Sequence, residues 1–192
     1  LPIEKLVIAT NQNDILHRTI ETGAYTKEGV KPSISPSMDI QVSSNFERAL
    51  FFAYDRDGDA VAQLMEELKD GSFTISQGAM EMLRETFTSG RASEEETMAT
   101  IKAEFSASQE VLCPHSAVAV KVANEQLSET PMITLATAHP AKFPDAVEKA
   151  MGVHPELPPH MADLMEREER SCKVPNQLAL LETLIKDRIA SR

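Results

Sequence analysis

Apolar runs, polar turns and amphipathic stretches follow one another at the start of the chain. Residues 5–10, KLVIAT, are an apolar run between polar residues, which is typical of a buried strand in a parallel sheet. Residues 11–14 then supply turn and N-cap side chains, and apolar residues recur at helical spacing from Ile15 until Gly23, a residue that commonly ends helices. This order predicts a strand–turn–helix unit, the elementary piece of an α/β fold.

The middle of the chain predicts loops and helices rather than strands. Residues 25–41 carry prolines and serines without a clear period, so we expect an ordered loop. Two Ser-x-x-Glu sequences, at 44–47 and 93–96, match the capping box that begins many helices. Amphipathic helices are predicted in four places: from the first box to about residue 54, over 61–68, around 80–87, and from the second box to about 105.

A second apolar run, MITLAT at residues 132–137, predicts a second buried strand. Helices are expected on either side of it and near the C-terminus, over 117–127, 143–150, 161–169 and 177–189. Two apolar strands cannot form a stable parallel sheet alone, because both faces need cover and both edges need neighbours. The pattern therefore predicts a helix-rich α/β fragment with few strands, whose sheet is completed by upstream partners.

Composition and charge narrow the possible partners. The chain has 192 residues, of which 42% are hydrophobic and 26% charged, as in ordinary globular proteins. Its formal net charge of −11 argues against a nucleic-acid partner, which would need a basic field, but allows an anionic small molecule. No apolar run approaches the roughly 18 residues that span a membrane, and we expect no membrane partner. Cys113 and Cys172 form no disulfide framework, so a reducing, cytoplasmic setting is expected.

Familiar catalytic and metal-binding motifs are missing from the sequence. It contains no Gly-rich nucleotide loop, P-loop, serine-hydrolase elbow or HExxH motif. The five histidines lack metal-ligand spacing, and DRDGD at 55–59 mimics only the start of a calcium loop. We therefore expect no metal site and interpret 55–59 as a solvated turn.

Three polar stretches stand where a strand should end or a helix should begin. Residues 10–14, TNQND, follow the first strand, where ligands of open α/β sheets bind, although Asn and Asp are also ordinary helix caps. In CPHS at 113–116, His115 beside a helix N-terminus is disfavoured as a cation, although a lone histidine is more often structural. Residues 136–143, ATAHPAKF, bring a hydroxyl, an imidazole and an ammonium together. These residues alone predict an anionic small-molecule site.

At these same stretches the sequence resembles threonine synthase, a family of pyridoxal-phosphate enzymes that convert O-phospho-L-homoserine and water to L-threonine and phosphate. The matching segments occur in the family's order up to about Gly152, and they are LPIEKLVIATNQNDILHR, SPSMDIQVSSNFER, SGRASEEETMATI, PHSAV and LATAHPAKFPDAV. The resemblance implies the longer size class of the family, a fold type II architecture with an α/β large domain, and pyridoxal phosphate as cofactor.

The resemblance also implies that this chain is the C-terminal part of the enzyme. No catalytic residue is expected in it, because the lysine that forms the Schiff base and the loop that binds the cofactor phosphate would lie upstream. The chain alone should therefore be inactive, with the upstream segment of the same polypeptide as its partner. Residues 1–40 would form a strand–helix unit of the large cofactor domain, 41–110 a helical insertion, and 111–192 the rest of the large domain with terminal helices.

Individual roles follow from the matching positions. Thr137 is implied to place its hydroxyl against the pyridine nitrogen of the cofactor, and His115 is implied to lie nearby. Arg48 and Lys142 would be anion contacts, although Arg48 can equally form a structural ion pair. Six residues are implied to bind the phosphorylated amino-acid substrate: Asn11, Asn13, Asp14, Arg48, His139 and Lys142.

One segment departs from the family's pattern and leaves alternatives open. The family reads Asp-Pro-His-Thr-Ala-Val-Gly where residues 113–119 read CPHSAVA. A Cys-Pro-His-Ser sequence resembles threonine synthase-like phospholyases, which release phosphate and 2-oxobutyrate, but TAHPAKF is intact as in the synthases. Beside the synthase, the alternatives are therefore such a phospholyase and a non-catalytic helical domain that binds a partner protein.

Overall fold

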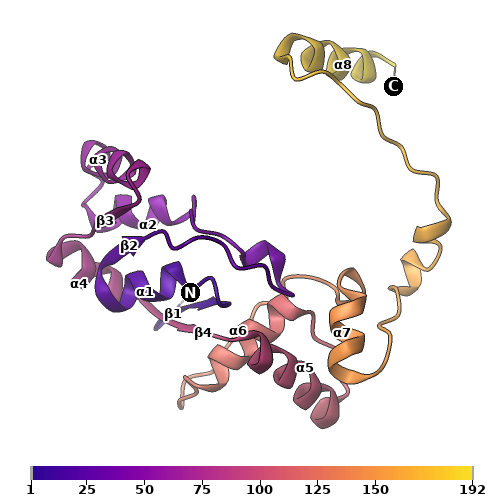
Figure 1. Ribbon diagram of the computed structural model, residues 1–192, viewed down its shortest axis with the longest axis horizontal. Coiled ribbons are helices and arrows are strands. Elements are labelled where there is room, and N and C mark those ends of the chain that lie inside the picture. The colour runs from indigo at the N-terminus through magenta and orange to yellow at the C-terminus, as the bar shows by residue number, and fades with distance from the viewer. Residues whose placement is uncertain (1, 192) are drawn as a thin grey trace. The chain divides into compact units, whose positions relative to one another are not determined.

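The computed structural model describes residues 2–191 (Figure 1). The chain divides into two compact units, one up to Glu156 and the other from Leu157 onward. The strands and most helices belong to the first unit. No helix in the described range is long and apolar enough to cross a lipid bilayer.

The first unit contains a two-stranded parallel sheet. β1 (Leu6–Thr10) pairs with β4 (Phe87–Arg91), so that Thr10 lies opposite Arg91 at the end where both strands finish, the carboxyl edge. β1 continues through a polar turn into α1 (Ile15–Thr22). Gly23 ends α1 at φ 80°, a left-handed conformation that glycine adopts without strain. The predicted strand–turn–helix unit is confirmed.

The helices α1 and α6 (Pro114–Asn124) cover opposite faces of this sheet. Successive side chains of a strand point to opposite faces. Ser89 lies against α1, where its Oγ is 2.9 Å from His17 Nδ1, and the next residue, Gly90, faces Val122 of α6. A Cβ at Gly90 would lie only 2.6 Å from a Val122 methyl carbon. The glycine therefore lets α6 approach the sheet closely.

α6 runs antiparallel to β4. Gln126, just beyond the C-terminus of α6, donates to the carbonyl of Ser89 at 3.2 Å, whereas Lys121, earlier in the helix, donates to the carbonyl of Arg91 at 2.8 Å. The N-terminus of α6 therefore extends toward the carboxyl edge. Because α1 also begins there, the carboxyl edge lies between two helix N-termini on opposite faces of the sheet.

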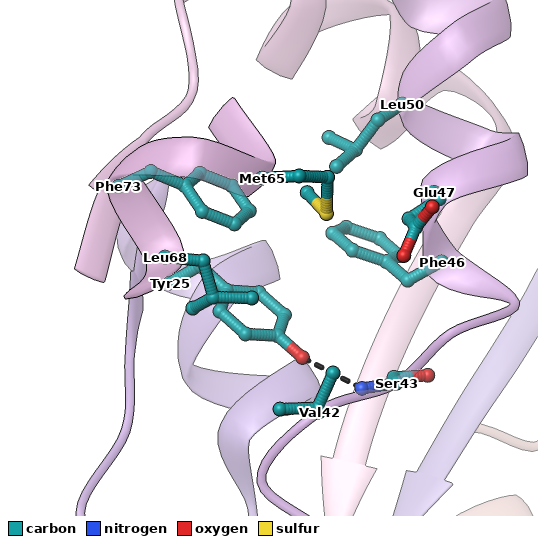
Figure 2. A pocket seen from close by; sticks show the side chains of 9 residues that line it. All are labelled: Tyr25, Val42, Ser43, Phe46, Glu47, Leu50, Met65, Leu68 and Phe73. Carbon is teal, nitrogen blue, oxygen red and sulfur yellow. Dashed lines mark hydrogen bonds between the residues drawn. The ribbon is translucent and has the colours of Figure 1, made fainter. Parts of the chain in front are cut away.

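An aromatic core holds the segment between β1 and β4. β2 (Ala24–Thr26) pairs antiparallel with β3 (Ser72–Thr74), and Tyr25 stacks on Phe73 and Phe46 with ring centroids 4.8 and 5.9 Å apart. Figure 2 shows these rings around a narrow cavity, where the Tyr25 hydroxyl accepts a hydrogen bond from the Ser43 N–H at 2.8 Å. Three helices contribute to this region: α2 (Phe46–Ala53), α3 (Gly58–Lys69) and α4 (Gln77–Thr86).

Two predicted helix signals beyond β4 are confirmed. α5 (Glu94–Ser108) begins with the capping box of Ser93 and Glu96, whose two reciprocal bonds are 3.1 and 2.7 Å long. α7 (Pro144–Met151) ends at Gly152, which has φ 78°. In the second unit, α8 (Leu178–Ala190) also lies where a helix was expected.

The predicted strand at 132–137 is wrong. This segment forms no strand within the described range, and Ile133 and Leu135 are 83% and 72% exposed. An apolar run becomes a strand only where another strand offers hydrogen bonds, and no neighbour pairs with it within residues 2–191. The partner of β1 is instead β4, whose sequence FTSGR lacks the apolar run that predicts a buried strand.

Four smaller predictions also need correction. Residues 44–47 form no capping box: α2 begins after Asn45, which makes no side-chain cap bond. Phe87 opens β4 instead of completing a helix. The expected loop at 25–41 includes most of β2 and the short helix η1 (Pro36–Met38). The expected helix at 161–169 is replaced by two single turns, η3 (Pro159–Met161) and η4 (Leu164–Glu166), because this polar segment has no buried face to stabilise a longer helix.

Candidate functional site

A network of amides and hydroxyls surrounds Asp39 next to the end of β1. Asn11 and Asn13 are buried, and their side-chain amides donate to Asp39 Oδ1 at 2.7 and 2.8 Å. Ser33 donates to the same oxygen through its hydroxyl at 2.6 Å and to Oδ2 through its backbone N–H at 2.8 Å. The turn after β1 and the loop that contains Asp39 are therefore fixed to one another.

His115 lies at the N-terminus of α6 against the same loop. Its Nε2 accepts a hydrogen bond from the Ser37 N–H at 3.3 Å, and its ring packs on Phe143 with centroids 4.6 Å apart. Burial lowers the pKa of His115, the Lys142 cation lowers it further, and the Asp39 carboxylate partly opposes both. The ring is therefore neutral near pH 7, and because Nε2 accepts, the proton resides on Nδ1.

The Nδ1 atom of His115 is an unsatisfied donor. It is buried, and no hydrogen-bond partner for it exists among residues 2–191. A buried donor without a partner is costly, so each such group in a native structure calls for an explanation. The unpartnered Nδ1 therefore makes the N-terminus of α6 a candidate contact for a polar ligand group.

Thr137 is tied to the same helix N-terminus. Its backbone N–H donates to Ser116 Oγ at 3.2 Å, and this bond does not use the exposed Thr137 hydroxyl. Ser116 in turn donates its backbone N–H to Cys113 Sγ at 3.4 Å, so the thiol caps α6. The cysteine therefore performs, more weakly, the capping that an acid at this position would perform.

His139 and Lys142 follow on the short helix η2 (Pro140–Lys142). His139 Nδ1 accepts the Ala141 N–H at 3.2 Å and so caps this turn. Lys142 Nζ lies 5.9 Å from the centre of the Phe143 ring, which packs on His115. Both side chains are exposed, so this segment offers an imidazole and a cation to a ligand.

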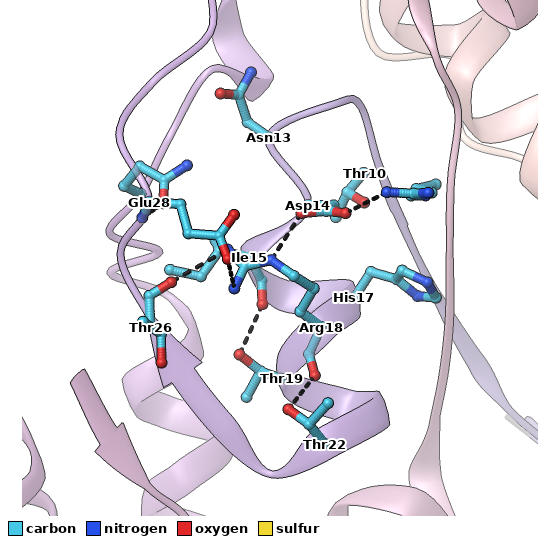
Figure 3. Close-up of polar contacts among 12 residues, drawn as sticks. Thr10, Asn13, Asp14, Ile15, His17, Arg18, Thr19, Thr22, Thr26 and Glu28 are labelled. Carbon is cyan, nitrogen blue, oxygen red and sulfur yellow. Dashed lines mark hydrogen bonds and ion pairs between the residues drawn. The ribbon is translucent and has the colours of Figure 1, made fainter. Parts of the chain in front are cut away.

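Asp14 holds two arginines. Arg18 Nε bonds one carboxylate oxygen at 2.9 Å (Figure 3). Arg91 Nη1 bonds the other at 2.8 Å. Burial alone would raise the pKa of Asp14, but the hydrogen bonds and charges of the two arginines outweigh burial and lower it. Asp14 is therefore an anion at neutral pH.

Comparison with known proteins identifies the family. A family model described as threonine synthase, C-terminal, matches residues 116–185. The threonine synthase of Pseudomonas aeruginosa is 47% identical over 189 residues, which are 96% of this chain and 40% of the relative. The chain belongs to the threonine synthase family.

Solved threonine synthases share the fold. The chain matches the pyridoxal-phosphate-bound threonine synthase of Brucella melitensis with TM-score 0.89 and 53% identity, covering 97% of this chain and 41% of that one. The yeast threonine synthase matches with TM-score 0.82 and 35% identity, covering 100% of this chain and 43% of that one. The predicted fold class is confirmed. The chain spans about 40% of the length of the first curated relative it matches.

Within this threonine synthase fold, most residues singled out by sequence lie around the carboxyl edge. Asn11 and Asn13 share Asp39, whose charge acts on His115. His115 packs on Phe143, and the neighbouring Ser116 accepts a hydrogen bond from the Thr137 N–H. Arg48 is different, because it lies exposed on α2 and donates to Asn45 at 3.3 Å. The structure does not bring Arg48 into contact with the other candidates.

Sequence reasoning missed two residues of this region. Asp39 is the common acceptor of the asparagines, and its only signal was its place in the matching MDI segment. Arg91 was missed because the strand that carries it was not predicted, although SGR lies in another matching segment. Both residues act through long-range pairing, which local patterns do not record.

Proposed function

We propose that this chain is the C-terminal part of a pyridoxal-phosphate-dependent threonine synthase, which converts O-phospho-L-homoserine and water to L-threonine and phosphate. The likeness to the pyridoxal-phosphate-bound enzyme of Brucella melitensis, at 53% identity over 97% of the chain, carries the proposal. The convergence of the candidate residues at the carboxyl edge supports it, because ligands of α/β sheets bind there.

The residues at the N-terminus of α6 fit the cofactor. When bound, pyridoxal phosphate acts as an electron sink for the amino acid. Thr137 offers an exposed hydroxyl, which can bond the pyridine nitrogen without keeping a proton on it as a carboxylate would. His115 offers the unsatisfied Nδ1–H, so a site completed by a bound group would explain a donor that residues 2–191 leave unpaired.

The substrate residues are assigned by the same reasoning. We place His139 and Lys142 on the substrate side because both are exposed on the segment that leads to Phe143, whose ring packs on His115. Asn11 and Asn13 would hold the loop of Asp39 in place, since their amides already bond that carboxylate. For Arg48, the bond to Asn45 favours a structural role over an anion contact.

We further propose that residues 1–192 alone do not catalyse the reaction. The resemblance to the family puts the Schiff-base lysine in the upstream segment of the polypeptide, which would complete both the sheet and the site. The same resemblance supports the division into 1–40, 41–110 and 111–192. The free thiols of Cys113 and Cys172 suit a reducing compartment, which favours the cytoplasm.

The full-length product of the gene tests this function. It is supplied with pyridoxal phosphate and O-phospho-L-homoserine, and threonine, 2-oxobutyrate and phosphate are quantified together. We expect threonine equal to phosphate. Phosphate with 2-oxobutyrate would show a phospholyase instead, and no phosphate release would reject both enzymes.

Thr137→Ala then tests the assigned cofactor contact. We expect this variant to lower kcat and to change the absorption spectrum of the bound cofactor. Thr100→Ala is the matched control, because within residues 2–191 the Thr100 hydroxyl bonds only the Glu96 carbonyl of its own helix, α5, at 2.8 Å. An unchanged spectrum and kcat in Thr137→Ala would contradict the assignment.

A further inference from the structure

Arg91 has a fixed backbone and an exposed side chain at the carboxyl edge. Its carbonyl accepts from Lys121 Nζ at 2.8 Å, and the N–H of the next residue, Ala92, donates to the Thr10 carbonyl at 2.9 Å. Strand alternation puts Arg91 on the same face as Ser89, the face that α1 covers. Its side chain is nevertheless 64% exposed, because α1 only begins at this edge.

A buried carboxylate holds this exposed guanidinium in one direction. The Asp14 side chain is only 10% exposed, and its Oδ2 accepts from Arg91 Nη1 at 2.8 Å. Its other oxygen accepts from Arg18 Nε at 2.9 Å, so each oxygen of Asp14 already bonds an arginine (Figure 3). Asp14 can therefore influence a ligand through the arginines that it bonds.

The two arginines differ in how many of their donors are used. Arg18 also bonds Glu28 at 3.0 Å and the Thr26 carbonyl at 3.2 Å, so it is satisfied on several sides. Arg91 is bonded through Nη1, and within the described part of the chain its Nε and Nη2 have no partner. Two donor atoms of its planar guanidinium, Nε and Nη2, are therefore free to bond a ligand. Such a pair of donors can bond two oxygens of one phosphate at once.

The surroundings favour an anion at this place. The N-terminus of α1 follows directly after Asp14 and contributes positive potential at the same edge. An ion pair with one exposed partner adds little to stability, whereas burying a carboxylate is costly. A buried acid that aims an exposed arginine is better explained by the ligand that the arginine meets.

We propose that Arg91 binds the phosphate group of a phosphate monoester at the carboxyl edge, and that Asp14 is a positioning residue that orients the guanidinium of Arg91. This inference rests on the proposed function and assigns the phosphate end of its substrate. It also gives Asp14 an indirect role in place of a direct substrate contact.

Phosphate binding by the full-length holoenzyme tests Arg91. Inorganic phosphate is the probe, and homoserine, which lacks the phosphate, is the reference ligand. We expect Arg91→Gln to weaken inorganic phosphate on the order of 10- to 100-fold and to raise the KM for O-phospho-L-homoserine by a similar factor, with homoserine affinity unchanged. Arg91→Lys keeps the positive charge but not the planar guanidinium, so it should lose less phosphate affinity than Arg91→Gln. Equal losses for phosphate and homoserine, or none for phosphate, would overturn the proposal.

Two substitutions at the same charge cluster test the positioning role. Asp14→Asn should weaken phosphate binding several-fold. Glu28→Gln removes the ion pair between Glu28 and Arg18 and should leave phosphate affinity unchanged. In the double variant Asp14→Asn/Arg91→Gln, the asparagine should add no further loss, because Asp14 acts through Arg91. Additive losses would overturn the positioning role.

The outcome is separable from that of the proposed function. Wild-type enzyme that forms threonine but whose phosphate affinity does not depend on Arg91 would overturn only the Arg91 site. Wild-type enzyme that binds phosphate through Arg91 but releases none from O-phospho-L-homoserine would reject the synthase and retain an anion site.

Discussion

The aromatic core and the carboxyl edge use buried residues in opposite ways. Around Tyr25, buried side chains are apolar or stacked, and the one hydroxyl has its partner in the Ser43 N–H. At the carboxyl edge, buried residues are amides, a carboxylate and an imidazole, and one of their donors has no partner within residues 2–191. The first region is therefore built for packing, whereas the second offers polar groups to a ligand. Stability should therefore depend most on the aromatic core, and pH and ligands should act most on the carboxyl edge.

The largest expected effect is in the aromatic core. Leu50 is fully buried, and Leu50→Ala should destabilise the region by about 2–5 kcal/mol because it leaves a cavity in a packed core. The control is Phe52→Ala on the same helix, since Phe52 is half exposed. Hydrogen exchange of the amides of α2 and α4 in the full-length enzyme measures both. Equal protection in the two variants would contradict the assignment of this core.

A backbone contact should give the next largest effect. Gly90→Ala should destabilise the enzyme by about 1–3 kcal/mol, because its Cβ would lie only 2.6 Å from a Val122 methyl carbon of α6. Gly78→Ala on α4 is the control, since a Cβ there meets nothing within 4 Å, and it should instead stabilise by about 0.4–1 kcal/mol. Urea unfolding compares them. Partial rescue of Gly90→Ala by Val122→Ala would confirm the clash as the cause.

Two serines that look alike in sequence should differ in effect. Ser93→Ala removes the formed capping box and should cost about 0.5–2 kcal/mol. Ser44→Ala should change the unfolding free energy by less than about 0.5 kcal/mol, because no such box forms at α2. Thermal melts of the two variants are sufficient. A larger loss for Ser44→Ala would show that the box forms after all.

The smallest expected effect is a dependence on pH at His115. Its folded pKa is depressed, so the unfolded chain takes up a proton at higher pH than the folded one. Stability is therefore fully present above the ordinary histidine pKa of about 6.5 and is lost as pH falls toward the lower folded value. NMR titration of His115 should show a midpoint below the ordinary histidine value of about 6.5. The variant His115→Gln should remove this part of the pH dependence from urea unfolding curves.

Sequence alone predicted the elements whose signals are local. The strand before Asn11, the helix after it, the box at Ser93 and the ends at Gly23 and Gly152 all depend on neighbouring residues, and the structure contains them. β4 could not be predicted in this way. Its five residues are a strand because β1 lies beside them, and the run at 132–137 is not one because residues 2–191 offer it no neighbour.

The candidate site was predictable as a set of residues but not as a network. Residues such as Asn11, His115 and Thr137 were found through the family's motifs, and their roles there stay predictions. Asp39 is recognised as a shared acceptor, and Arg91 as a guanidinium held by Asp14, only in the structure, where segments distant in sequence meet. Which chemical group satisfies which partner is a property of the fold, and no spacing along the chain encodes it.

The pairing of β1 with β4 has a consequence for how the protein folds. The bond from the Thr10 hydroxyl to the Gly90 carbonyl joins residues 80 positions apart, so a long loop must close before the strands gain anything. The aromatic core lies entirely inside that loop, and its formation brings the two ends of the connection nearer. Contacts between residues far apart in sequence form slowly, so we expect the parallel sheet to form late in folding. The rate at which it forms should depend on how early the aromatic core forms.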